Sequence, residues 1–313
     1  RLAYPKGAHY DYNIESQIIA DFVNFEWNLS EKTKLVTGIR GEKVNYEYET
    51  NIEPGTKGRI QVSPNRDDDF TEFSPKLAIN HKINDELAIF ANYSRGNRAP
   101  QTTDLYRIQS KQTPGGAKSD KLESLESGLR GNFSIFNLEL VGFNMRKENY
   151  FFRDSQGFNV ENGKTTHRGF EINFLAEFNQ FFQIENSTSF AEHEYDFDHS
   201  PNGIKSGNQI DSAPELLANT RFIFTPKERT RIELEWEKID SYPVDERNAH
   251  FYKGHNVFNL RAKTPINENL SIGIYVNNIT DKSYANRADF AFGSYRYFVG
   301  QKREFYLMLE SKF

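Results

Sequence analysis

The sequence predicts an all-β fold, an antiparallel transmembrane β-barrel, from its hydropathy, its composition and its residue periodicity. The mean hydropathy of the 313 residues is −0.74 and 14% of them are aromatic, whereas only two are methionine. No apolar run approaches the ~20 residues that a spanning helix requires. A barrel wall, in contrast, needs an apolar side chain only at every second position. A soluble β-sandwich or propeller shares much of this composition, so the pattern along the chain must decide.

Alternation of apolar and polar residues, the period of a half-buried strand, recurs along the whole chain. It runs through segments 87–93, 170–177, 231–237 and 270–277. We expect one face of each strand to meet lipid and the other face to line the barrel lumen. The residues predicted to face lipid are Ile232, Leu234, Trp236, Leu270, Ile272, Ile274, Leu307 and Leu309, and those predicted to face the lumen are Glu233, Glu235, Tyr275 and Asn277.

The connections between the predicted strands fall into two classes that alternate along the chain. Short polar turns are expected at 28–32, 82–86, 131–134, 178–180, 226–229 and 265–269. Long links rich in glycine, proline and aspartate are expected at 51–69, 97–120, 153–164, 196–211, 240–253 and 281–294. Antiparallel barrels have short periplasmic turns and long extracellular loops, so the alternation indicates about thirteen strands of such a barrel.

The C-terminal segment carries a signature of its own. Phe305, Leu307, Leu309 and Phe313 fall on alternate positions and form an apolar stripe that ends on a terminal aromatic residue. Chain ends are usually frayed and solvated, so a soluble protein gains little from this arrangement. The stripe resembles the signal by which the barrel assembly machinery recognises outer-membrane proteins. We expect these four residues to serve as the assembly signal.

Deletion of Phe313 should therefore lower the amount of assembled full-length protein in the outer membrane. The reason is that the assembly machinery would meet a strand without its terminal aromatic side chain. Surface protein and transcript are measured in parallel, and transcript should not change. Unchanged surface levels would show that the terminal aromatic residue is incidental to assembly.

Several short motifs, in a fixed order, resemble those of TonB-dependent outer-membrane receptors. Segment 94–100 reads Ser-Arg-Gly-Asn-Arg-Ala-Pro, and Asp-Leu-Tyr follows at 104–106, like an Arg-Ala-Pro turn and an acidic-Leu-aromatic triplet of the family. Further similar motifs stand at 122–130, 166–171, 212–214, 276–284 and 300–303. In the last motif Gln301 and Lys302 depart from the family's Gly-x-Pro-Arg, which leaves Arg303 as the match. Each motif is weak alone, but their order over residues 75–313 is specific.

The resemblance implies a barrel of about 22 strands closed by an N-terminal plug, with both chain ends in the periplasm. Residues 1–313 are then expected to form the C-terminal portion of one barrel domain, with about thirteen of its strands. Residues 1–12 would be the remnant of an outer loop, and the plug, the TonB box and the early strands would be missing. The family imports scarce nutrients and is not enzymatic. Contact with the TonB complex would belong to the missing plug.

The composition argues against several other classes of protein. The chain has no cysteine, which excludes disulfides and thiolate metal sites. A net charge of −5 argues against a nucleic-acid partner, and no GxSxG, P-loop or HExxH motif indicates an enzyme. Two weak metal signals remain, namely His193-Glu194 with His199, and the run 66–69, whose aspartates could hold Ca²⁺ in an outer loop. For both, a solvated surface is the favoured interpretation, and no metal site is predicted.

A cluster of cations and a tyrosine on the outer segment 95–111 favours a ferric siderophore as the imported ligand. Ferric siderophores are commonly anionic, and arginine contacts carboxylates in a bidentate manner while tyrosine stacks on planar groups. The candidate ligand-binding residues are Arg95, Arg98, Tyr106, Arg107 and Lys111, with Tyr252, Tyr295 and Tyr297 on other loops. For Arg98 alone, a role in shaping the turn is favoured.

Other ligands fit the same sequence less well. Haem receptors resemble this chain at the Arg-Ala-Pro turn but also carry a histidine before an Asn-Pro-Asn-Leu stretch. No histidine lies between Arg98 and Leu122 here, so the resemblance disfavours haem. Cobalamin or an oligosaccharide is the alternative ligand, and Asn248 together with the three tyrosines on other loops would serve it. Two further classes are alternatives, an outer-membrane enzyme of smaller barrel size and a passive outer-membrane channel of about fourteen strands, and the ordered motifs support neither.

Overall fold

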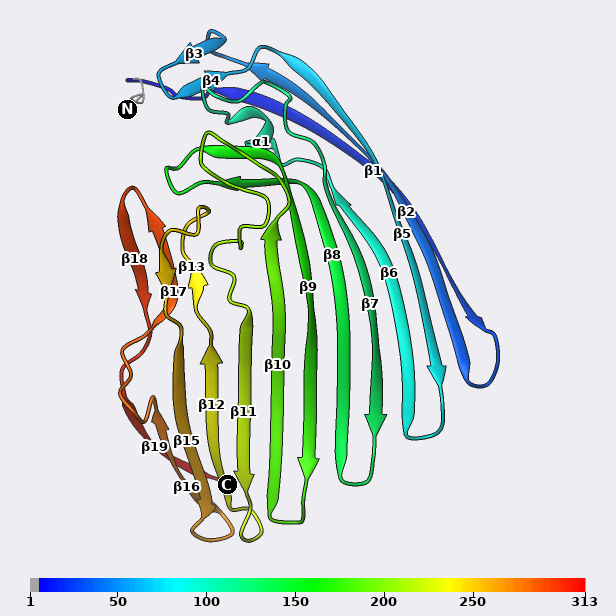
Figure 1. The fold of residues 1–313 in the computed structure, drawn as a ribbon, viewed down its shortest axis with the longest axis vertical. Helices are drawn as coiled ribbons and strands as arrows, with labels where there is room; N and C mark the ends of the chain where they lie inside the picture. Colours follow the sequence, from blue (N-terminus) through cyan, green and yellow to red (C-terminus); the bar gives the residue numbers. More distant parts are fainter. Residues whose placement is uncertain (1–5, 313) are drawn as a thin grey trace.

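A computed structural model describes residues 6–312 as a single curved antiparallel sheet with its long connections gathered at one end (Figure 1). Thirteen strands form this sheet, in the order β1-β2-β5-β6-β7-β8-β9-β10-β11-β12-β15-β16-β19. Their bounds are Tyr12–Asn28, Thr33–Thr50, Arg66–Lys82, Leu87–Arg98, Asp120–Asn132, Phe136–Arg153, Asn159–Glu177, Phe182–Tyr195, Leu216–Phe224, Arg231–Ile239, His255–Pro265, Leu270–Asn277 and Glu304–Ser311. The predicted all-β class and strand count are confirmed.

The remaining elements lie within the long connections at the upper end of the sheet in Figure 1. Three small hairpins consist of β3 (Gly55–Lys57) with β4 (Ile60–Val62), β13 (Tyr242–Pro243) with β14 (Phe251–Tyr252), and β17 (Ala285–Ala291) with β18 (Ser294–Val299). One short helix, α1 (Thr102–Tyr106), follows β6. In the described part of the chain no helix has the length and apolar character needed to cross a membrane.

The short turns join strand pairs at the lower end of the sheet, as predicted, but two of the long connections are shorter than predicted. Asp67, Asp68 and Asp69 belong to β5, where they pair with residues 45–47 of β2. Residues 159–164 likewise belong to β9. Polar composition suggested loops at both places, but these strands continue past the apolar part of the sheet, where both faces meet water.

The two faces of the sheet differ in chemistry as the alternation predicts. Ile274, Leu307 and Leu309 are 50%, 68% and 65% exposed, and Ile274 lies directly opposite Leu307 on the neighbouring strand. Glu233 and Glu235, one residue out of phase with the apolar positions of β12, are 8% and 3% exposed. The apolar side chains therefore form the outer face, and the glutamates belong to the inner face.

Glu235 is the centre of a charged network on that inner face. Its carboxylate lies 2.9 Å from the Arg261 guanidinium and 3.2 Å from that of Arg221. Asn219 and Asn259 each donate a side-chain hydrogen bond to the same carboxylate, at 3.0 and 3.1 Å. A carboxylate this deeply buried is tolerated because every partner is a cation or an amide donor.

The strands differ widely in length across the sheet. β1, β2, β5, β8 and β9 contain 17 to 19 residues, whereas β16 and β19 contain 8 each. Under the loops above the long strands, a buried cluster fixes α1 against β2. It consists of Tyr48, Leu105, Tyr106 and Ala117.

The final strand, β19, pairs with β16 along its whole length. Phe305, Leu307 and Leu309 are exposed on its outer face, and Phe313 lies outside the described residues. The role of these residues as an assembly signal stays a prediction.

Candidate functional site

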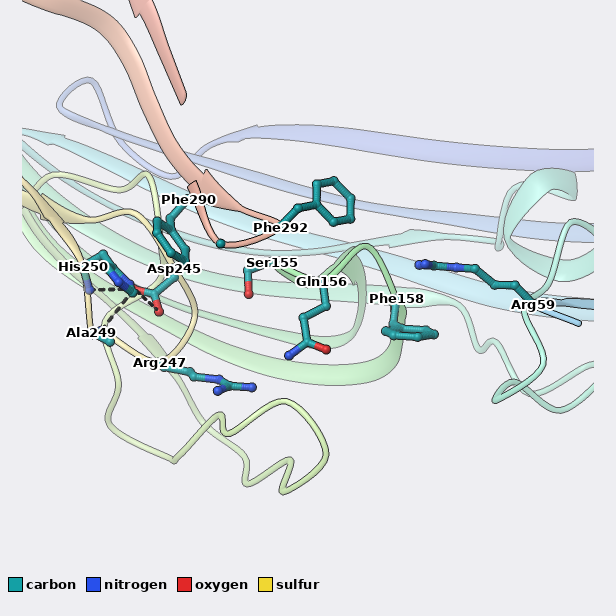
Figure 2. A pocket seen from close by; sticks show the side chains of 11 residues that line it. Arg59, Ser155, Gln156, Phe158, Asp245, Arg247, Ala249, His250, Phe290 and Phe292 are labelled. Atoms are coloured by element: carbon teal, nitrogen blue, oxygen red, sulfur yellow. Dashed lines mark hydrogen bonds and ion pairs between the residues drawn. The ribbon is translucent and has the colours of Figure 1, made fainter. Parts of the chain in front are cut away.

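A pocket of about 500 Å³ opens among the outer loops, where four segments distant in sequence meet. Figure 2 shows Arg59 and Phe158 at one end and His250 with Phe290 at the other, and Gln156 lies between them. The lining residues are Arg59 from the β3–β4 turn, Ser155, Gln156 and Phe158 from the β8–β9 link, Asp245, Arg247, Ala249 and His250 from the β13–β14 link, and Phe290, Phe292 and Gly293 from the β17–β18 hairpin.

One end of the pocket places two cations beside one aromatic ring. Arg59 Cζ lies 4.2 Å from the centroid of the Phe158 ring, and Lys111 Nζ lies 4.4 Å from the same centroid. The Arg59 guanidinium also donates to the carbonyl oxygen of Gly157, which fixes its orientation. The face of one ring attracts a cation within about 6 Å but does not neutralise its charge. This end therefore has a positive potential.

The other end of the pocket is built from stacked rings. The imidazole of His250 lies 3.7 Å from the Phe290 ring at an interplanar angle of 11°, and Tyr295 approaches the same imidazole edge-on at 5.5 Å. The buried Asp245 carboxylate accepts hydrogen bonds from the backbone N–H groups of Ala249 and His250. Asp245 therefore shapes the loop that presents the imidazole, and the rings offer a flat apolar surface.

Glu246 ties together two of the segments that line the pocket. It is 2% exposed, and its carboxylate accepts hydrogen bonds from Ser155 Oγ at 2.8 Å and from Ser155 N at 3.1 Å. Burial raises the pKa of the Glu246 carboxyl, an effect that the Ser155 hydrogen bonds oppose. Phe292 N donates to Ser155 O at 3.0 Å from the opposite hairpin. The Ser155 segment is thus fixed from two sides, which holds the pocket in shape.

Comparison with known proteins places this architecture in a family. The chain matches, over residues 2–279, the family model described as TonB dependent receptor-like, beta-barrel. This chain belongs to the TonB-dependent receptor family. The members of this family are outer-membrane proteins and transporters rather than enzymes, so the predicted recognition and location are confirmed.

The individual relatives are distant. The metal-pseudopaline receptor CntO of Pseudomonas aeruginosa is 20% identical over 269 residues, which cover 83% of this chain and 36% of CntO. Among solved structures, the ferric citrate transporter FecA superposes with a TM-score of 0.79 at 16% identity, over 99% of this chain and 47% of that one. The ferric-catecholate import receptor Fiu of E. coli K12 gives 0.75 at 18%, over 96% and 45%. The chain spans about a third of the length of the curated relatives it matches.

The receptor's two arginines on β6 have different surroundings. Arg95 lies opposite Glu123 of β7 and Arg98 lies opposite Asp120, and their odd and even positions place them on opposite faces of the sheet. Arg98 Nη2 lies 2.6 Å from Asp120 Oδ2. Arg98 thus pairs with Asp120 at the start of the loop after β6, and its role in shaping this turn stays a prediction.

Tyr106 and Arg107 do not line the pocket. Tyr106 is fully buried, stacks on Tyr48 with ring centroids 4.3 Å apart, and donates to Asp68 Oδ2 at 2.8 Å. Burial, together with the hydrogen bond to Asp68, raises the pKa of Tyr106. Arg107 lines a neighbouring pocket of about 410 Å³ that shares Arg59 with the first. Among the predicted residues of segment 95–111, Lys111 is the one whose cation reaches the Phe158 end of the first pocket.

The predicted tyrosines on other loops separate in the same way. The hydroxyl of Tyr252 already has two partners within the protein. It forms a hydrogen bond with His255 Nδ1 at 2.8 Å and accepts one from the backbone N–H of Ala285 at 3.0 Å. Tyr295 and Tyr297 are 42% and 54% exposed and stack in parallel, with ring centroids 5.9 Å apart. Asn248, which was considered for an alternative ligand, bonds the backbone of Gln209 through both side-chain groups.

The sequence analysis missed most of the pocket. Arg59, Phe158, Arg247, His250 and Phe290 come from four links, and no local pattern in the sequence brings four links together. One signal was available, namely an aromatic residue beside a glycine at a hairpin turn. Phe292 and Gly293 both have positive φ, 54° and 82°, so this turn projects an exposed ring.

Neither of the two weak metal signals assembles within residues 6–312, where no three His, Cys, Asp or Glu side chains group as a metal site. Arg66 forms an ion pair with Asp68 at 2.5 Å, and Asp67 and Asp69 lie on the opposite face of β5. His199 bonds Asn202, whereas His193 contacts His167 instead.

Proposed function

We propose that this chain forms the wall and part of the ligand-binding surface of a TonB-dependent importer whose cargo is a ferric siderophore. The observation that carries the proposal is the outer pocket, which Arg59 and Arg247 line together with the rings of Phe158 and Phe290. Lys111 adds a further positive charge over the Phe158 ring. Its volume of about 500 Å³ lies in the usual range for small-molecule sites.

The chemistry of the pocket favours an anionic chelate with planar groups. Arginine and lysine contact carboxylate or catecholate oxygens through charge-assisted hydrogen bonds, and aromatic rings stack on a planar ligand. The two acidic residues at the pocket, Asp245 and Glu246, are buried and already accept hydrogen bonds from the protein. The carboxylates of Asp245 and Glu246 therefore repel a bound anion less than free carboxylates would. FecA, Fiu and CntO are named for metal chelates, which agrees with this choice.

Transport itself would follow the mode of the family. The ligand binds among the outer loops, and the TonB complex, driven by the proton gradient of the inner membrane, acts on a plug to open a path through the lumen. In this scheme the present chain supplies binding and the wall of the path, and no bond in the cargo is broken.

Replacing both Arg247 and Lys111 by glutamine should weaken uptake of the ferric siderophore. Each lost contact to a charged group costs about 1.5–3 kcal/mol, so uptake at limiting ligand should fall by about tenfold or more. The measurement is ⁵⁵Fe-siderophore uptake, across a panel of catecholate, hydroxamate and carboxylate siderophores, in a strain that carries the full-length receptor. Lys205→Gln, which removes an exposed cation from a different outer loop, is the matched control and should leave uptake unchanged.

Cobalamin or an oligosaccharide is the alternative cargo, favoured by the parallel, exposed rings of Tyr295 and Tyr297. Rings of this kind can stack on a sugar without any cation. Expression induced by an oligosaccharide, indifferent to iron and unaffected by Arg247→Gln with Lys111→Gln, would replace the siderophore proposal with this one. Induction by iron limitation agrees with the siderophore.

A further inference from the structure

Two histidines face each other across neighbouring strands. His167 of β9 and His193 of β10 are directly paired in register. Their Nδ1 atoms lie 2.8 Å apart, and their ring centroids lie 5.0 Å apart at an angle of 58°. Both imidazoles therefore aim the same nitrogen at a common point, and one proton between the two nitrogens satisfies both.

The pair lies on the lumen side of the wall. On the same strands Phe170 and Phe190 pair on the outer face, and both histidines fall on the opposite phase. The outward neighbours Arg168 and Glu192 form an ion pair at 2.6 Å, which marks the outer limit of the apolar band at this place. The histidine pair thus lies inside the barrel, close to its outer mouth.

A soft donor lies beside the pair. Met145 of β8 is directly opposite His167 in the antiparallel ladder, so the two side chains share the lumen face, with Cβ atoms about 4.5–5.5 Å apart. Directly below, the facing pair is Gly169 with Ala191, and this position is closely packed, since Ala191 is 3% exposed. The row formed by Met145, His167 and His193 therefore offers one thioether and two imidazoles side by side.

The surroundings favour a neutral, ligand-ready imidazole. Thr165 Oγ1 lies 2.9 Å from His167 Nε2 and can accept its proton, which leaves the Nδ1 lone pair directed at the common point. Lys147, two residues from Met145 on the same strand, is a cation on this face. Its Nζ lies 3.7 Å from the Asp120 carboxylate and 4.3 Å from the centroid of the Tyr150 ring. Part of its charge is thus compensated by its own partners.

We propose that His167, His193 and Met145 form a copper-binding site in the lumen of the receptor, independent of the outer pocket. Imidazole nitrogens bind first-row metals at about 2.0–2.1 Å, so two neighbouring donors on one ion stand about 3 Å apart, close to the separation seen here. Imidazole suits copper and zinc alike, whereas a thioether selects Cu(I), and copper binds more tightly than zinc at a given site. Copper would take the place of the proton that the two nitrogens share, and that proton would move to His193 Nε2, so that both imidazoles bind as neutral rings through Nδ1.

Copper retention by the purified, untagged full-length receptor tests the proposal. The receptor is loaded with Cu(I) under ascorbate and titrated with bicinchoninate, whose copper complex is read by absorbance. Loss of an outer partner of a metal ligand already costs about 10–100-fold in affinity, so His167→Gln or His193→Gln should weaken Cu(I) binding by at least about tenfold. Met145→Leu should weaken Cu(I) binding while leaving Zn(II) binding as it is in the unchanged receptor.

His81→Gln is the matched control, because His81 of β5 bonds Thr33 at the other end of the sheet and should not affect copper. Heat-modifiable mobility on gels confirms that each variant is folded. Wild-type receptor that yields its copper as readily as the His167→Gln, His193→Gln double variant would overturn the site. Met145→Leu that retains Cu(I) fully, or wild-type that holds Zn(II) more tightly than copper, would overturn the copper assignment.

Discussion

Replacement of Glu235 by alanine is expected to lower the free energy of unfolding by about 3–5 kcal/mol, because it removes one partner of a buried ion pair. The Glu235 carboxylate is 3% exposed and contacts Arg261 at 2.9 Å and Arg221 at 3.2 Å. Alanine would leave both guanidinium groups, and the amides of Asn219 and Asn259, without their shared acceptor. Urea unfolding of the full-length receptor in detergent micelles, followed by tryptophan fluorescence, measures the loss.

Glu26→Ala provides the matched control for this loss. Glu26 pairs with Lys34 at 2.5 Å, but both side chains are about half exposed, so solvent screens the pair and its loss should change the stability little. Glu235→Gln keeps an acceptor oxygen without the charge and should fall between the two. If Glu26→Ala lowers the free energy of unfolding as much as Glu235→Ala does, then burial is not the reason that the Glu235 network stabilises the receptor.

Replacement of Ile274 by arginine is expected to cost about 2–4 kcal/mol, the cost of placing a charge on the lipid face near the bilayer midplane. Ile274 is 50% exposed and lies between Ala262 and Leu307 on the neighbouring strands, both of which are apolar. The guanidinium would meet hydrocarbon with no partner in reach. The measurement is the fraction of folded receptor after lipid reconstitution, read by heat-modifiable gel mobility.

Tyr275→Arg tests the same depth on the opposite face. Tyr275 is the next residue along β16, and its hydroxyl points at Met308 on the lumen side. Arginine there can reach water in the lumen, so its cost should be much smaller than that of Ile274→Arg. Equal losses for the two variants would contradict the assignment of faces.

Periodicity alone was enough to predict the sheet and its two faces. In segment 231–237 the side chains of Ile232 and Leu234 had to share one face and those of Glu233 and Glu235 the other, because the strand period is two residues. The short turns were predictable for a similar reason, because each is a polar segment of a few residues between two strands that are adjacent in the sequence. These features depend on contacts that are local in sequence.

The upper limits of the strands could not be predicted. Asp67, Asp69 and residues 159–164 look like loop residues because they are polar, yet they continue β5 and β9. Above the apolar band both faces of a strand meet water, so the apolar signal disappears while the backbone pairing continues. The pocket was hidden for a different reason, because its walls come from four links whose meeting depends on the curvature of the whole sheet.

One motif that the sequence analysis matched only by resemblance has a physical explanation in the structure. Asn278, within the 276–284 motif, is 1% exposed and has φ of 50°, a conformation that asparagine tolerates better than most residues. Its Oδ1 accepts from Lys282 N at 2.8 Å, and its Nδ2 donates to the carbonyls of Lys282 and Gln301 at 2.9 Å. Arg303, the matching residue of the last motif, donates to Ile279 O. The two motifs thus bond to each other where the long link between β16 and β19 begins and ends.

Because the strands differ in length, the outer end of the barrel wall is asymmetric. At about 3.3 Å per residue, strands of 17 to 19 residues extend about 60 Å and strands of 8 residues about 26 Å, against an apolar band about 25 Å tall. The strands around β16 therefore end near the membrane surface, whereas those around β9 rise well above it. On the flank of the short strands the outer wall is completed by the β17–β18 hairpin, whose Phe292 N donates to Ser155 O of the β8–β9 link, whereas on the other flank the sheet itself forms the wall. A reporter epitope placed in the link between the long strands β8 and β9 would be accessible to antibodies from outside the cell without disturbing the bilayer.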